Sequence, residues 1–282
     1  MVVNRELKQL LEHNSFSQID DPALIEHINT FSLVKYKDRS DEHIKNAMVD
    51  VLLSSELNSF VNVHQYKFQE IIIGVTQFID SLIMKHGLNN IQILEHDYKY
   101  YHRLQPDIHF AQVGNLEPNG HLIMSMPFAG HCSKHKQMEQ IIEECNQKSI
   151  SVHLDCAWMG TAKDINFDFG AECVKSFAMS FSKPYGLYWN RVGIRWSKNY
   201  DETDAVTIFN NFDMYNSTLI RVAYHYLINF NIDYLWNKYR KAYEQVCKET
   251  YTFPTNIVWL GKDVRGQLIG MGPALLNVCV SN

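Results

Sequence analysis

Ser180-Phe-Ser-Lys183-Pro-Tyr-Gly-Leu-Tyr-Trp-Asn-Arg191-Val-Gly193 is the most informative stretch of this 282-residue chain. It follows the apolar, strand-like run 174–179, so a short turn carries both a lysine and an arginine. A neutral lysine amine can form a Schiff base with a carbonyl, and burial or a nearby cation lowers its pKa. Arg191 stays charged and can bind a phosphate through two hydrogen bonds. The stretch therefore predicts a nucleophilic amine and a fixed cation that face one small anionic ligand, with Ser180 as a further donor.

The pattern Ser-x-Ser-Lys-x-x-Gly, followed by Arg-x-Gly, resembles the Schiff-base segment of the aspartate aminotransferase superfamily. These are the fold-type I enzymes, aminotransferase class I/II, that use pyridoxal 5'-phosphate (PLP). The resemblance implies that Lys183 holds PLP through a Schiff base and that Ser180 and Arg191 bind its phosphate. The alternative is a solvated turn lysine beside the start of an ordinary strand.

A carboxylate for the pyridine nitrogen of the cofactor is expected at Asp155. This residue ends the β-rich run 150–155, and ligand groups of open α/β sheets lie at the carboxyl ends of strands. A carboxylate there keeps the ring protonated, so that the ring can accept electrons. The alternative is an aspartate that caps the next turn. The family usually has a tyrosine three residues later, where this chain has Trp158, whose indole donates a hydrogen bond but cannot accept one.

A phosphate cradle is expected at Gly74, Val75 and Thr76. The run 70–84 reads as a short strand, a glycine turn and an amphipathic helix that ends at Gly87. Unpaired N–H groups at a helix N-terminus bind anions, and the family has a small-residue turn in this place. The alternative is ordinary packing of a strand against a helix.

Tyr98 is the predicted aromatic face for the pyridine ring. The segment 91–98 resembles a family strand that ends in Glu-Pro-x-Tyr, whose tyrosine stacks on the cofactor. The neighbouring Tyr100 and Tyr101 are interpreted as ordinary positions of an amphipathic helix.

One family group is missing from the sequence. The family's Asn-Pro-x-Gly turn supplies an asparagine to the phenolic oxygen of the cofactor, whereas the matching turn here is 127–130, with proline at its start. His131 is either a substitute for that asparagine or a residue at the start of the next helix.

The order of apolar runs predicts an α/β fold, with a three-layer α/β/α large domain around a seven-stranded, mostly parallel sheet and a reduced C-terminal small domain. Strands are expected at 70–73, 91–95, 108–113, 121–126, 150–155, 174–181 and 191–196, and helices at 75–86, 98–104 and 133–148. The predicted division is an N-terminal helical arm (1–60), a PLP-binding large domain (61–200), and a helical segment with the small domain (201–282).

Composition favours a cytoplasmic enzyme with a sizeable core. Apolar residues make up 46% of the chain, and the formal net charge of -5 with interspersed signs argues against a nucleic-acid partner. No apolar run of about 18 residues predicts a membrane span, and the N-terminus does not resemble a signal peptide. The 6 cysteines lack a Cys-x-x-Cys pair and the 13 histidines are spread along the chain, so reduced thiols and no metal site are expected.

Substrate recognition is the least determined feature of the sequence. Family aminotransferases bind the substrate carboxylate with an arginine of the small domain, and Arg265 holds roughly that position; an exposed hairpin arginine is the alternative. Arg195 and Arg221 are further candidates.

The resulting hypothesis is a homodimeric, PLP-dependent enzyme that transfers an amino group from an amino acid to an oxo acid. Lys183 and Asp155 are its predicted catalytic residues. A PLP-dependent lyase, decarboxylase or oxidase is one alternative, because the cofactor supplies the chemistry of each. A catalytically reduced PLP-binding protein is a second, and an unrelated α/β protein with a coincidental motif is a third.

Overall fold

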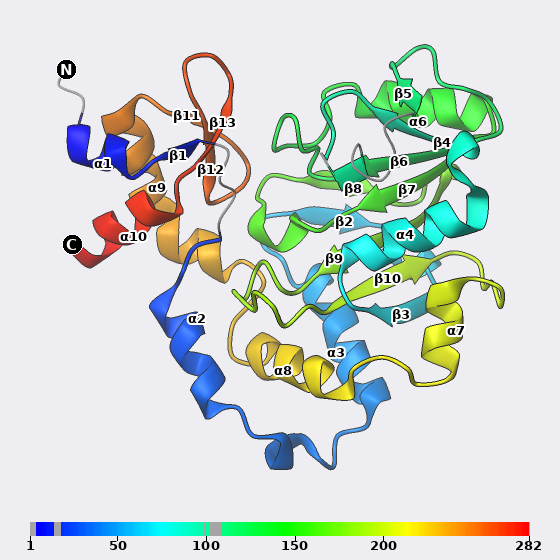
Figure 1. Ribbon diagram of the computed structural model, residues 1–282, viewed down its shortest axis with the longest axis horizontal. Helices are drawn as coiled ribbons and strands as arrows, with labels where there is room; N and C mark the ends of the chain where they lie inside the picture. The colour runs from blue at the N-terminus through cyan, green and yellow to red at the C-terminus, as the bar shows by residue number, and fades with distance from the viewer. Residues whose placement is uncertain (1–3, 14–17, 99, 102–108, 282) are drawn as a thin grey trace.

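A seven-stranded sheet forms the centre of the molecule, as seen in a computed structural model that describes residues 4–13, 18–98, 100–101 and 109–281 (Figure 1). Strand β10 runs antiparallel to both of its neighbours, and the remaining neighbours are parallel. These strands coincide with the seven predicted ones, so the predicted fold class is confirmed. In spatial order they are β3 (Phe68–Ile72), β10 (Gly193–Ser197), β9 (Val174–Ser180), β7 (Ser151–Asp155), β6 (His121–Ser125), β4 (Ile91–Leu94) and β5 (His109–Ala111).

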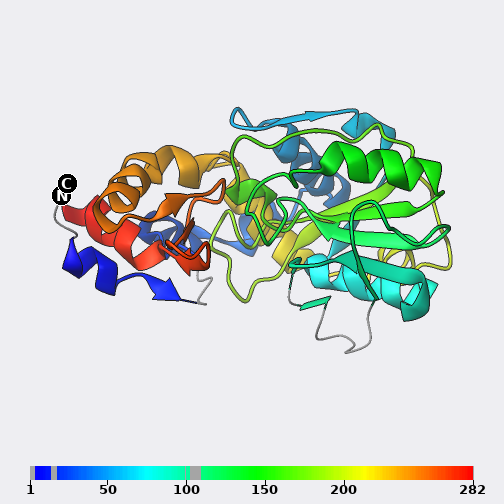
Figure 2. The same cartoon turned by 90° about the horizontal axis from the view of Figure 1, so that it is seen from above.

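Helices cover both faces of this sheet and complete the three layers (Figure 2). Successive side chains of a strand point to opposite faces, so Ile71 joins one apolar cluster and Ile72 the other. The Ile72 cluster contains buried residues of α4 (Val75–His86) and α7 (Ala205–Asn211). The Ile71 cluster contains buried residues of α3 (Asp41–Leu53), α6 (Met138–Gln147) and α8 (Ser217–Leu227).

The predicted helices agree with the structure to different degrees. Helix α4 has the predicted bounds, between Gly74 and Gly87. The prediction of a helix from residue 133 was wrong, since α6 begins at Met138. The segment before it is a turn, with Cys132 in the left-handed region at φ 53° and a bridge between Phe128 and Ser133. Of the helix predicted at 98–104, residues 100 and 101 are helical, and residues 99 and 102–104 lie outside the described part of the chain.

A small antiparallel sheet joins the two ends of the chain. Its strand order is β1 (Glu12–His13), β13 (Leu268–Gly270), β12 (Leu260–Lys262) and β11 (Phe253–Pro254). Helices α1 (Arg5–Gln9), α9 (Tyr234–Thr250) and α10 (Gly272–Ser281) pack together beside it. The segment predicted as an N-terminal arm is therefore divided, because its first part belongs to this sheet while α3 packs against the central sheet.

The remaining elements are short. They are α2 (Pro22–His27), the parallel pair β2 (Ser59–Val61) and β8 (Asn166–Asp168), and the 3₁₀ helices η1 (Ile28–Thr30), η2 (Leu33–Tyr36), η3 (Val63–Gln65), η4 (Leu88–Asn90) and η5 (Met159–Thr161). Within the described ranges, every helix is too short or too polar to cross a bilayer.

A buried network of charged side chains links the antiparallel strand β10 to β3 and to the start of α7. Arg195 of β10 donates to Glu70 of β3 at 2.7 Å and to Asp204, the N-cap of α7, at 2.6 Å. Thr207 donates to the second oxygen of Glu70 at 2.6 Å. Arg195 is thus engaged within the sheet, and its candidacy as a substrate-binding arginine is corrected.

Replacement of Arg195 by methionine should destabilise the fold strongly. It would leave two buried carboxylates without their cation, which costs about 3–5 kcal/mol for a buried pair that loses one partner. Urea unfolding would measure the loss. The matched control is Arg240→Met, whose partner Glu244 is as exposed as Arg240 itself, and its loss should stay below about 1 kcal/mol. Equal losses in the two variants would contradict a structural role for the network.

Candidate functional site

Lys183 lies in the turn that follows β9, where its half-buried side chain borders two adjoining cavities. The turn is held by Ser182, whose hydroxyl donates to the carbonyl of Asn190 at 3.2 Å and accepts from the N–H of Val192 at 3.3 Å. Burial lowers the pKa of Lys183 to about 8, while the negative charge of Asp155 opposes this shift. A neutral, nucleophilic amine is therefore accessible near neutral pH.

Asp155 borders the same two cavities from the end of β7. Its carboxylate accepts hydrogen bonds from the hydroxyl of Tyr101 at 3.0 Å and from the N–H of Ala157 at 2.9 Å. Burial raises the pKa of Asp155, and the charge of Lys183 opposes that rise. The two hydrogen bonds fix the carboxylate in place without removing it from the cavity wall.

The other end of the larger cavity is built for an anion. Helix α4 begins there, directly after Gly74, so its unpaired N–H groups face this region. Arg191 donates to the hydroxyl of Thr76 at 2.7 Å. A Cβ at position 74 would lie 2.8 Å from Nη2 of Arg191, and Gly74 has φ 115°, so this turn requires glycine. Ser180 lines the same cavity.

Aromatic side chains form the walls between these two ends. Tyr98 borders both cavities and is 36% exposed, which leaves part of its ring open to a ligand. Trp158 borders the smaller cavity, and the amine of Lys183 lies 4.9 Å from the centroid of a Trp158 ring. The larger cavity has a volume of about 250 Å³. A cavity of about 480 Å³ elsewhere, beside β3, contains none of the predicted site residues.

The structure thus brings together the residues predicted for cofactor binding. Gly74 does not line either cavity, but it adjoins the guanidinium of Arg191, which a Cβ at position 74 would meet. The residues on the cavity walls are Val75, Thr76, Tyr98, Asp155, Trp158, Ser180, Lys183 and Arg191.

Other predicted residues lie elsewhere. Arg265 is exposed in the turn between β12 and β13 and is absent from the cavity walls, since that hairpin directs it to solvent. Arg221 pairs with Asp41 at 2.7 Å, at the start of α3. His131 packs beside Phe128 in the turn before α6 and is likewise absent from the described cavity walls. These three residues therefore lie away from the described cavity walls beside Lys183, and the substrate-binding role of Arg265 stays a prediction.

Sequence reasoning missed several residues of the site. Tyr101, interpreted as an ordinary helix position, is fully buried and bonds Asp155. Asp97 is buried beside the cavity and accepts from the N–H of Ser125 at 2.9 Å; burial raises the pKa of Asp97 to about 7. Ser125 lines the smaller cavity and Gln18 the larger one. For Asp97, the sequence held one signal of a place in the site: it follows shortly after β4 and directly precedes Tyr98.

Comparison with known proteins identifies the fold. No family model and no curated protein sequence matches this chain. Among solved structures, it is similar to aspartate aminotransferase from Thermotoga maritima, with a TM-score of 0.58 and 10% identity over 99% of this chain and 95% of that one. A PLP-bound C–S lyase from Staphylococcus hominis has a TM-score of 0.60 and 8% identity, over 94% of this chain and 86% of the other.

An aromatic amino acid aminotransferase from Burkholderia cenocepacia gives a TM-score of 0.55 and 9% identity, over 98% of this chain and 94% of that one. At such identities the likeness establishes the fold alone. The chain has the fold of the fold-type I PLP enzymes, as its sequence motifs predicted.

The lowered pKa of Lys183 should be visible in its reactivity. Acetylation of ligand-free protein, followed by peptide mass spectrometry, should show half-maximal modification of Lys183 near pH 8, because burial disfavours its ammonium form. In Asp155→Asn the midpoint should move to lower pH, since the aspartate charge now holds it up. Exposed Lys67 is the internal reference. Identical pH profiles for Lys183 and Lys67 would contradict the buried, perturbed amine.

Proposed function

We propose that this chain is a PLP-dependent enzyme of amino-acid metabolism that transfers an amino group from an amino acid to an oxo acid. One observation carries the proposal: Lys183 and Asp155 border the same cavity, and the anion-binding end of that cavity is formed by the α4 N-terminus and Arg191. This arrangement offers an amine, a carboxylate and a phosphate cradle at once.

The residues present fit PLP. Its phosphate would lie at the turn before α4, where Gly74 leaves room for the guanidinium of Arg191 and Thr76 holds that guanidinium in place. Ser180 supplies a hydroxyl on the same wall. The pyridine ring would lie against the open face of Tyr98, an arrangement that contributes about 0.5–1.5 kcal/mol for an aromatic pair.

Bound PLP supplies an aldehyde for covalent attachment and a ring that withdraws electrons from the substrate. The protein's own residues would hold and move protons around it. Asp155, fixed by Tyr101 and Ala157, would keep a proton on the ring nitrogen. Lys183 would attach the cofactor and, once released, carry a proton to or from the substrate α-carbon. Its lowered pKa suits this role, because the amine must accept and donate near neutral pH.

The partners of the cofactor's phenolic oxygen differ from the family pattern, and this favours a second candidate. Trp158 stands where a tyrosine is usual, and Pro127 begins the turn that usually supplies an asparagine. Trp158 and Ser125 are hydrogen-bond donors on this wall. A PLP-dependent lyase, as in the C–S lyase of the same fold, is therefore the second candidate.

The absence of a second cavity arginine supports the third candidate, a catalytically reduced PLP-binding protein. On the walls of the two cavities beside Lys183, as far as the structure describes them, Arg191 is the sole arginine, and it belongs to the phosphate end. The homodimer that the resemblance implies would allow a partner subunit to supply the missing cation. The dimeric state and the cytoplasmic location stay predictions.

Lys183→Ala should abolish covalent attachment of PLP. With added PLP, the wild-type protein should show a visible absorbance band, and borohydride reduction should place the adduct on the Lys183 peptide. A panel of amino donors and oxo acids should then give turnover of the wild-type protein. Lys67→Ala replaces an exposed lysine that lines neither of the two cavities beside Lys183; it is the matched control and should behave as wild type.

Three outcomes separate the candidates. Amino transfer confirms the main proposal. Release of a thiol, ammonia and an oxo acid from a thioether-bearing donor, without an added oxo acid, points to the lyase. A Lys183-dependent band without turnover supports the reduced protein. No such band in the wild-type protein overturns PLP binding altogether.

Gly74→Ala should weaken PLP binding selectively. The added Cβ displaces Arg191 from the phosphate, and a hydrogen bond to a charged group contributes about 1.5–3 kcal/mol, so affinity should fall about 10- to 100-fold. Spectroscopic PLP titration would measure this fall. Gly87→Ala is the control, since Gly87 also has a positive φ of 73° at the other end of α4 but has no atom near its added Cβ. An equal loss in both variants would refute the cradle.

A further inference from the structure

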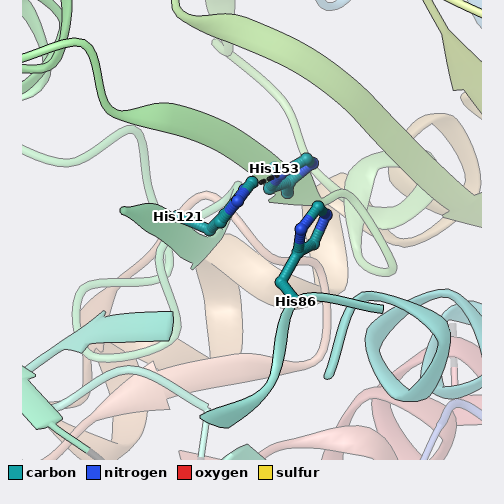
Figure 3. A group of neighbouring side chains, drawn as sticks. All are labelled: His86, His121 and His153. Atoms are coloured by element: carbon teal, nitrogen blue, oxygen red, sulfur yellow. Dashed lines mark hydrogen bonds between the residues drawn. The ribbon is translucent and has the colours of Figure 1, made fainter. Parts of the chain in front are cut away.

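Three histidines gather at the edge of the central sheet opposite to Lys183 (Figure 3). His86 is the last residue of α4, His121 the first of β6, and His153 lies in β7. One ring nitrogen from each lies within 4.8 Å of the others. The sequence predicted no metal site because its histidines are scattered, but the fold brings these three from distant positions to one point.

Two of the three histidines, His121 and His153, already lie at a separation that suits a shared metal ion. Nδ1 of His121 lies 3.1 Å from Nε2 of His153. Zinc–nitrogen bonds of 2.0–2.1 Å in a tetrahedron would separate neighbouring nitrogens by about 3.3 Å. The other nitrogen of His153 lies 2.7 Å from the hydroxyl of Ser176 on β9. Such a second hydrogen bond fixes the orientation and tautomer of a metal-binding imidazole.

His86 completes the set after a rotation of its ring. The ring is stacked on that of His121, with centroids 3.6 Å apart, so its plane must turn to aim a nitrogen at a shared ion. His86 is half-buried at the end of a helix, beside exposed Gly87, and borders a cavity, so the rotation would turn its ring within a partly open environment.

The space and the charges around the three histidines are compatible with a bound cation. A cavity of about 320 Å³ reaches the histidines. The nearby cations Lys85 and Arg195 are paired with Asp201 and Asp204, so these carboxylates offset positive charge that would otherwise oppose a metal ion. The remaining charged group on the described cavity wall is Lys175, which extends from β9.

We propose that His86, His121 and His153 bind one divalent transition-metal ion of the zinc class, with water at the open position. Three imidazoles suit zinc, nickel or copper, and poorly suit magnesium or calcium. The ion would join the C-terminal end of α4 to β6 and β7. Because α4 starts at the phosphate cradle and β7 ends at Asp155, the ion would brace the far ends of two elements that carry the candidate active site.

Zinc titration of tag-free, chelator-treated protein tests the proposal without any PLP-dependent assay. Calorimetry should give one Zn²⁺ per chain, and Zn²⁺ should raise the melting temperature, because a ligand that binds only the folded state stabilises it. Both effects should disappear in His86→Asn/His121→Asn, which alters only half-buried side chains. His64→Asn, an exposed histidine on η3, is the matched control and should retain them.

Ser176→Ala gives a second, milder measurement. Loss of the hydroxyl that orients His153 should weaken Zn²⁺ binding about 10- to 100-fold while the stoichiometry stays at one. Zinc binding that is absent from wild-type protein, or that persists unchanged in the double histidine variant, would overturn the proposal. Circular dichroism of each variant verifies that the fold is retained.

Discussion

The parallel arrangement of β4, β6, β7 and β9 is the constraint on which both sites depend. Parallel strands place all their carboxyl ends at one edge of the sheet and all their amino ends at the other. Asp155 and the turn with Lys183 therefore meet at one edge, although they belong to different strands. His121 and His153 meet towards the opposite edge for the same reason.

The electrostatics of the candidate active site follow from burial at that edge. Burial disfavours the charged forms of Lys183 and Asp155, so the pKa of each group shifts towards its neutral form, and the charge of the other limits the shift. The network of Arg195 shows the contrasting case. There, direct hydrogen bonds to Glu70 and Asp204 satisfy the buried charge, which suits a structural role.

Sequence patterns predicted the parts of the structure that depend on local order. The seven strands and α4 follow from apolar periodicity bounded by glycine. The residues predicted to bind the cofactor came from motifs in a fixed order, and most of them line the two adjoining cavities. The start of α6 could not be predicted in this way, because a bridge from Phe128 and the left-handed Cys132 override its helical pattern.

Arg265, Tyr101 and the histidine cluster show a second limit of sequence reasoning. The orientation of the β12–β13 hairpin decides where Arg265 lies. The orientation of the helical turn that contains Tyr101 decides that its hydroxyl reaches Asp155. The histidines meet only because α4, β6 and β7 are neighbours in space. Each of these depends on tertiary packing, which leaves no trace in residue spacing.

The pairing of β1 with β13 has a consequence for how the protein is made. Strand β1 is translated before all seven strands of the central sheet and β13 after all of them, so β1 finds its partner only once the central sheet has been made. All seven strands of the central sheet lie between β1 and β13 in the chain, so this sheet can assemble before β13 is made. We therefore expect the nascent chain to form its α/β core first and to close the small sheet afterwards.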